Sequence, residues 1–152
     1  MPRMPRATRI NHVSIVAQDL PASTRFWVEL FGAIVVPSPN FGTPVVWLRL
    51  GDQQLHLFQT ADPPPENGHF AVEVDDFQAT YAEARRRGVY ERIYRLPDGG
   101  AQMYLRDPGG NLVEVDCPDA ERLDPAVVDD LVPLPCPQAG ENLRATLFER
   151  IS

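Results

Sequence analysis

Two stretches of the sequence decide the fold: INHVSIVAQDLPASTRFWVELFG at residues 10–32 and NGHFAVEVDDFQATYAEARRRG at residues 67–88. Each has a histidine near its start, then an alternating apolar segment, an acidic residue, a helical pattern and a closing glycine. His12 and His69 correspond at an offset of 57 residues, and Gly32 and Gly88 at an offset of 56. The chain therefore contains an internal repeat, and each glycine is predicted to cap its helix in the left-handed conformation.

Short strand patterns follow each helical stretch, separated by turn signals such as Asp107-Pro108-Gly109-Gly110. Each copy is therefore predicted to be a βαβββ module, and the fold class to be α+β with two tandem modules. The modules cover residues 9–60 and 67–117, and residues 118–152 form a proline-rich extension with short helices near 125–131 and 141–148. The strands after the helices are predicted at residues 33–37, 45–50, 54–58, 90–95, 101–106 and 112–116.

The composition is that of a soluble globular protein, with 43% apolar and 23% charged residues in a chain of 152. The net charge of −7 makes nucleic acid a poor partner, because an acidic surface repels the phosphate backbone. The two cysteines, Cys117 and Cys136, form no CxxC pair, so reduced thiols are expected. No apolar run approaches the roughly 18–20 residues that span a bilayer, and a cytoplasmic protein without membrane partners is expected.

The three histidines of the chain, and one glutamate, share a pattern within predicted strands. Side chains alternate between the two faces of a strand, and each of these residues opposes apolar neighbours that can cover the helix side of its sheet. The spacings match, with 44 residues from His12 to His56 and 45 from His69 to Glu114. If the two sheets pair their open faces, these four side chains project into one cavity.

Imidazoles together with a carboxylate suit a borderline divalent metal, and two histidines with one carboxylate leave coordination positions open for water, substrate or dioxygen. Burying Glu114 without a cation would be costly and would raise its pKa, an objection that metal binding removes. We therefore expect one divalent metal ion per site, held by His12, His69 and Glu114, with His56 as either a fourth ligand or an acid–base residue.

These segments, together with QLHLF at 54–58 and YLRDPGGNLVEV at 104–115, resemble the vicinal oxygen chelate superfamily over about residues 9–117. That group includes glyoxalase I, methylmalonyl-CoA epimerase, extradiol ring-cleaving dioxygenases, and fosfomycin and bleomycin resistance proteins. The resemblance implies a U-shaped half-barrel around the metal, a small-molecule substrate and, as is common in the group, a homodimer. The metal positions of the group map onto His12, His56, His69 and Glu114.

The resemblance to extradiol dioxygenases is the more detailed one. They hold iron at the positions of His12, His69 and Glu114, keep an uncoordinated acid–base histidine on the preceding strand, and carry a tyrosine ten residues before the glutamate. His56 and Tyr104 would fill these two catalytic roles. An extradiol-type dioxygenase acting on a catechol-like substrate is therefore the first expectation, with Fe²⁺ favoured over Ni²⁺, Zn²⁺, Co²⁺ or Mn²⁺.

Two other functions stay open. A glyoxalase I- or epimerase-like lyase or isomerase would hold its metal with all four residues and use Glu114 as the base, although glyoxalase I-like members usually carry glutamate at the position of His56. A non-catalytic binding protein, like those that sequester antibiotics, would instead rely on aromatic side chains such as Trp47 and Phe41, whereas Trp27 is expected to lie in the core.

Overall fold

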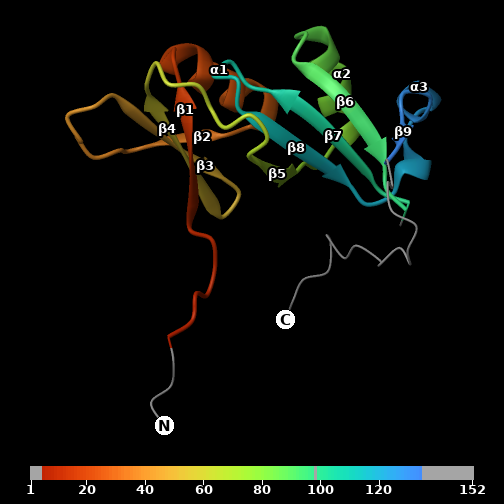
Figure 1. Cartoon of the computed structure of the whole chain (residues 1–152), viewed down its shortest axis with the longest axis horizontal. Coiled ribbons are helices and arrows are strands. Elements are labelled where there is room, and N and C mark those ends of the chain that lie inside the picture. Colours follow the sequence, from red (N-terminus) through yellow and green to blue (C-terminus); the bar gives the residue numbers. More distant parts are fainter. Residues whose placement is uncertain (1–4, 98, 135–152) are drawn as a thin grey trace. The chain divides into compact units, whose positions relative to one another are not determined.

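The computed structural model describes residues 5–97 and 99–134, and the chain divides into two compact units, Met1–Pro64 and Pro65–Ser152 (Figure 1). Each unit contains one βαβββ module, so the predicted α+β fold with two tandem modules is confirmed. Each module folds its strands into one mixed sheet with its helix packed on one face.

The first unit forms a sheet of four strands in the order β1-β4-β3-β2. The first and last strands of the module lie side by side and parallel, and the other neighbours are antiparallel. Asp19 begins the helix by accepting a hydrogen bond from the Ala22 amide at 2.9 Å, and Gly32 ends it at a φ of 64°, as predicted. The elements are β1 (His12–Ala17), α1 (Leu20–Phe31), β2 (Ile34–Val36), β3 (Val45–Leu50) and β4 (Gln53–Gln59).

The core of the first unit lies between α1 and one face of its sheet. Leu48, Leu55 and Leu57 turn toward the helix and are buried, and Phe26 and Trp27 of α1 cover them. Trp27 is fully buried, as expected, and is therefore a packing residue. The opposite face of the sheet, called its open face below, carries His56 and Trp47 on neighbouring strands.

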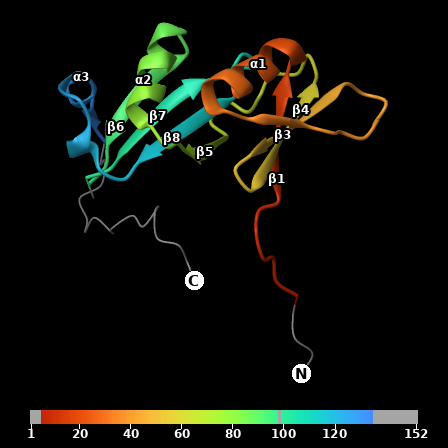
Figure 2. The same ribbon diagram turned by 180° about the vertical axis from the view of Figure 1, so that it is seen from behind.

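The second unit repeats this plan with five strands in the order β5-β8-β7-β6-β9, and Figure 2 shows α2 in front of these strands. Asp76 caps the helix through the Ala79 amide at 2.8 Å, and Gly88 follows the helix at a φ of 69°. Ile93, Met103 and Val113 are buried on the helix side. The elements are β5 (His69–Glu73), α2 (Phe77–Arg86), β6 (Tyr90–Arg95), β7 (Ala101–Arg106), β8 (Leu112–Cys117) and β9 (Val132–Pro133).

The described part of the extension packs against the second module. It forms a 3-10 turn (Ala120–Arg122), the short helix α3 (Pro125–Val128) and β9, which pairs in parallel with β6. Asp130 accepts hydrogen bonds from the Tyr81 hydroxyl at 2.8 Å and from Arg85 at 3.0 Å, which fixes α3 to α2. The helix predicted near 125–131 is thus present in shorter form, and the one predicted near 141–148 lies outside the described residues.

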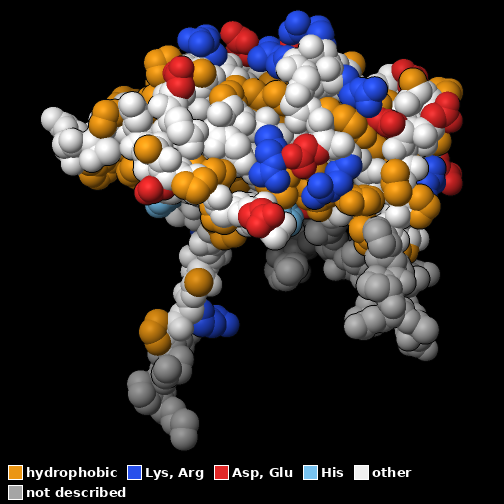
Figure 3. All heavy atoms as spheres, turned by 45° about the horizontal axis from the view of Figure 1, so that its top comes forward, with side chains coloured by type: hydrophobic (Ala, Val, Ile, Leu, Met, Phe, Trp, Pro, Cys, Tyr) orange, Lys and Arg blue, Asp and Glu red, His pale blue; other side chains and the backbone are white. Residues whose placement is uncertain are grey.

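Acidic and basic side chains are interspersed on the face shown in Figure 3. Within the described residues, no helix has the length and apolar character needed to cross a membrane.

Candidate functional site

The open face of the first sheet carries a stack of three rings. The rings of His12 and His56 lie 4.2 Å apart at 18°, and those of His56 and Trp47 lie 4.2 Å apart at 1°. Strand register produces the second contact, because Trp47 of β3 lies directly opposite His56 of β4. Phe41 extends the aromatic surface, with its ring 6.1 Å from that of Trp47.

The two histidines of this stack use opposite ring nitrogens. His12 Nδ1 lies 2.9 Å from Asn11 Oδ1, so a proton on Nδ1 leaves the Nε2 lone pair for a ligand. His56 instead has Nε2 placed 2.8 Å from Gln54 Oε1. When His56 donates from Nε2 to this amide oxygen, Nδ1 is the nitrogen left to accept a proton.

His56 is set up to remain neutral. It is 5% exposed, and burial together with the nearby His12 lowers the pKa of its imidazole below the ordinary value of 6.5. Neutral imidazole is the form that can act as a general base or a metal ligand.

The open face of the second sheet carries a carboxylate surrounded by donors. Glu114 accepts a hydrogen bond from the Tyr104 hydroxyl at 2.6 Å and one from the Gln102 amide at 2.7 Å, and His69 Nε2 lies 3.0 Å from its Oε2. Tyr104 lies opposite Glu114 in the β7–β8 register. Asn111 closes the preceding Asp107–Gly110 turn onto Asp107 at 2.9 Å, which fixes the start of β8.

Tyr104 is held as a neutral donor. Burial and its hydrogen bond to Glu114 raise the pKa of the phenol above 10, whereas Arg92 acts in the opposite direction. The hydroxyl therefore keeps its proton at neutral pH and can offer it to an oxygen atom.

Both ring nitrogens of His69 face acceptor oxygens. Its Nδ1 faces the Asn67 carbonyl oxygen at 3.1 Å, and its Nε2 faces the Glu114 carboxylate at 3.0 Å. A carbonyl oxygen can only accept, so Nδ1 carries a proton, and Nε2 then needs a proton or a metal ion between itself and the carboxylate. Two ligand atoms each about 2.1 Å from a metal and at a right angle are about 3.0 Å apart, so His69 and Glu114 already have a spacing that fits a divalent ion.

Asp116 adds a second buried carboxyl group beside Glu114. Burial and the neighbouring Glu114 raise the pKa of Asp116 to about 7. Its Oδ1 is buried and has no hydrogen-bond partner among the residues that the structure describes. A nearby divalent cation would favour the ionised form of Asp116, so the donor set of this face fits a metal.

The predicted site residues therefore come together as two pairs, His12 with His56 in the first unit and His69 with Glu114 in the second. The described residues contain no group of three or more His, Cys, Asp or Glu side chains that could hold a metal ion. Three neighbouring residues were not identified from the sequence, although strand alternation places each two residues from a predicted one on the same face. They are Gln54, Gln102 and Asp116.

Comparison with known proteins identifies the family. Residues 9–115 match the Glyoxalase/Bleomycin resistance protein/Dioxygenase superfamily. The chain belongs to this superfamily. The predicted resemblance is thereby confirmed, since this match covers nearly the same residues and both βαβββ modules.

Relatives within the superfamily have different activities. Human mitochondrial methylmalonyl-CoA epimerase is 29% identical over 71% of this chain and 73% of its own length. Biphenyl-2,3-diol 1,2-dioxygenase 3 of Rhodococcus globerulus is 26% identical over 70% of this chain and 62% of its own. The solved structure of lactoylglutathione lyase from Agrobacterium tumefaciens is 29% identical with a TM-score of 0.60, covering 74% of this chain and 95% of that one. Membership of the superfamily therefore leaves the reaction to be argued from the site.

Proposed function

We propose that the protein is a metal-dependent enzyme of the extradiol dioxygenase type, acting on a small catechol-like substrate. In this proposal His12, His69 and Glu114 hold one divalent metal ion, with Fe²⁺ favoured, and His56 is a separate acid–base residue. The observation that carries it is the use of the ring nitrogens: His12 and His69 are both fixed through Nδ1, whereas His56 is fixed through Nε2 by Gln54.

The protein groups have distinct roles in this proposal. His56 accepts a proton from a substrate hydroxyl, because its lowered pKa keeps it neutral and the rings of His12 and Trp47 hold its plane. Tyr104 donates a hydrogen bond to a substrate oxygen, exchanging its contact with Glu114 for one with the ligand. The metal, when bound, supplies Lewis acidity and a common point of attachment for two adjacent oxygens.

An epimerase- or lyase-like reaction is the second candidate. Two of the relatives support it, the human epimerase and the bacterial lyase, both at 29% identity. Here all four residues would hold the metal and Glu114 would move a proton. To bind the metal through Nε2, His56 would have to lose its contact with Gln54. To keep that contact, His56 would have to bind the metal through Nδ1, unlike His12 and His69. The contact between His56 and Gln54 therefore favours the first candidate.

We further propose that residues 9–60 and 67–117 contribute the two halves of one site, in a cytoplasmic homodimer. The charge of −7 favours a small-molecule substrate over nucleic acid.

The deciding experiment compares His56→Phe with His12→Phe, because phenylalanine keeps a flat ring in the stack and removes both nitrogens. Both variants are loaded anaerobically with Fe²⁺, and bound iron per chain and oxygen uptake with catechol are measured, with circular dichroism as the folding check. Retained iron and lost uptake in His56→Phe, with iron lost in His12→Phe, is the expected result. Iron lost from both variants would favour the four-ligand lyase or isomerase, and a wild type that binds no divalent metal would refute both candidates and leave a binding protein.

A further inference from the structure

Strand β6 places an additional charged side chain, Arg92, on the open face of the second sheet. Tyr90 pairs with Leu105 and Arg92 with Tyr104, so the register shifts by one residue at a β-bulge between them. From Arg92 to Arg95 the strand alternates regularly, so Arg92 faces the same side as Tyr104, opposite the buried Ile93. The bulge turns Glu91 toward this side as well, where it contacts Arg106, and bulges of this kind often redirect a side chain beside an active site.

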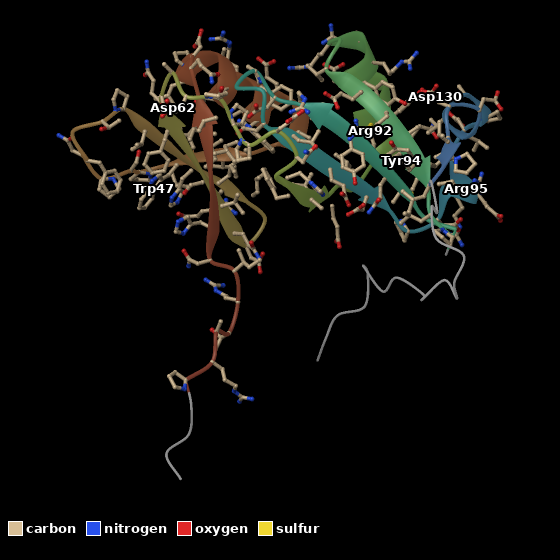
Figure 4. The ribbon with its side chains drawn as sticks, viewed as in Figure 1. Trp47, Asp62, Arg92, Tyr94, Arg95 and Asp130 are labelled. Atoms are coloured by element: carbon tan, nitrogen blue, oxygen red, sulfur yellow. The ribbon has the colours of Figure 1, made fainter. Side chains whose placement is uncertain are left out.

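Arg92 lies over the aromatic side chains of this face. Its guanidinium carbon is 4.9 Å from the centre of the Tyr104 ring and 5.8 Å from that of Tyr94. Figure 4 shows Arg92 and Tyr94 on β6, with Arg95 further along the strand. Arg92 therefore belongs to a row that runs across three strands, from Glu114 through Tyr104 to Arg92.

The hydrogen-bonding capacity of Arg92 is largely unused. Within the described residues its one hydrogen bond is from Nη1 to Glu91 at 3.3 Å, and its side chain is 45% exposed. Glu91 is held more closely by Arg106, whose Nε lies 2.5 Å away and whose Nη1 also donates to the Gly110 carbonyl at 2.8 Å. Arg106 is thus committed to structure, whereas the guanidinium fork of Arg92 remains available to a planar anion.

The corresponding position in the first module carries no charge. There Trp47 occupies the place of Tyr104, beside His56, and its neighbour on the outer strand is Val36. Only the second module therefore ends this row in a cation. Such an asymmetry would orient a ligand whose two ends differ.

We propose that Arg92 forms an anion subsite that binds a carboxylate of the substrate, at the end opposite the oxygens that chelate the metal. This inference rests on the proposed function and names its substrate class: an aromatic diol that bears a carboxylate away from the diol. Neighbouring strands are about 4.8 Å apart, so Glu114 and Arg92 are separated by two such steps at their backbones. Because the guanidinium reaches back over Tyr104, the ligand must span roughly 5–10 Å between its chelating oxygens and its anion.

The negative charge of this face explains why an anionic substrate would need such a subsite. The same face carries the buried carboxyl groups Glu114 and Asp116, and the whole chain has a charge of −7. An anionic substrate would be repelled by this face unless a cation received it. Arg92 supplies that cation at one end of the row, as the metal does at the other.

The test measures binding to protein loaded anaerobically with Fe²⁺, by calorimetry, with three probes. Catechol has no carboxylate, 3,4-dihydroxybenzoate carries one on the far side of the ring, and 2,3-dihydroxybenzoate carries the same group next to the diol. The wild type is expected to prefer 3,4-dihydroxybenzoate to both others. Arg92→Gln should weaken this probe about 10- to 100-fold, as loss of a charge-assisted contact does, and leave catechol within about twofold. Arg95→Gln, which removes the same charge from the other face of β6, is the matched control and should change neither.

The outcomes separate the two proposals. If the wild type binds catechol and 3,4-dihydroxybenzoate equally well, the anion subsite is overturned and the proposed function remains. The same conclusion follows if Arg92→Gln and Arg95→Gln change the affinity for 3,4-dihydroxybenzoate to the same extent. If the iron-loaded wild type binds none of the three diols, the proposed function is wrong and the subsite falls with it.

Discussion

The buried carboxyl group of Asp116 provides a direct test of the electrostatics of the second module. Its pKa is raised from 3.8 to about 7 by burial and by Glu114. Between these two values the folded state binds more protons than the unfolded state, so this group lowers the free energy of unfolding as pH rises. The effect begins near the unfolded pKa and is complete above pH 7.

The size of the effect follows from the same shift. Each pKa unit corresponds to about 1.4 kcal/mol, so Asp116 costs the metal-free protein about 4 kcal/mol above pH 7. Roughly 2 kcal/mol of that cost develops between pH 5 and pH 7. His56 acts in the opposite direction, because its lowered pKa makes stability rise with pH up to about 6.5, but its contribution cancels between two proteins that both contain it.

The assay is urea unfolding of chelator-treated wild type and Asp116→Asn, followed by far-ultraviolet circular dichroism at pH 5, 6, 7 and 8. The variant is expected to gain about 2 kcal/mol relative to wild type between pH 5 and pH 7. Asp75→Asn, at an exposed position of the same unit, is the control and should show no such gain. A difference between Asp116→Asn and wild type that stays constant with pH would refute the reasoning.

Three further predictions concern single residues. Glu114→Gln should weaken divalent metal binding more than about 100-fold, measured by calorimetry, because it removes the charge that faces His69 at 3.0 Å; unchanged affinity would exclude Glu114 as a ligand. Tyr104→Phe should leave metal stoichiometry intact and slow turnover about 10- to 100-fold, a split that a merely structural tyrosine would not produce. Asp130→Asn should lower the free energy of unfolding by about 1 kcal/mol at pH 7, since it weakens the contacts to Tyr81 and Arg85; the loss should shrink at acidic pH, because the lowered pKa of Asp130 makes its stabilisation disappear as that group protonates.

Much of the fold could be predicted because it depends on local patterns. The bounds of β3, β6 and β7 agree with the prediction, and β2 is shorter than predicted at its two ends. Strand alternation also assigned His56 and Glu114 to the face opposite their buried neighbours, since a period of two residues allows only one answer.

Other features depend on contacts between distant segments. The bulge between Tyr90 and Arg92 adds one residue to β6, and the apolar pattern of YERIYR does not reveal where. Strand β9 has two residues and pairs with β6, and the segment before it is held to α2 by the contact between Asp130 and Tyr81. The choice of ring nitrogen in His56 depends on Gln54, which strand alternation places on the same face but whose side-chain contact the sequence does not specify.

The two modules show why one backbone plan can support unequal halves of a site. The register places an aromatic residue opposite each predicted functional residue, Trp47 opposite His56 and Tyr104 opposite Glu114. A buried carboxylate needs donors, and Tyr104 and Gln102 supply them, whereas a neutral imidazole needs a flat neighbour and a single polar partner, which Trp47 and Gln54 provide. Equivalent backbone positions thus hold a charged group in one module and a neutral one in the other. This arrangement suits the proposed roles of Glu114 as a metal ligand and of His56 as a separate proton acceptor.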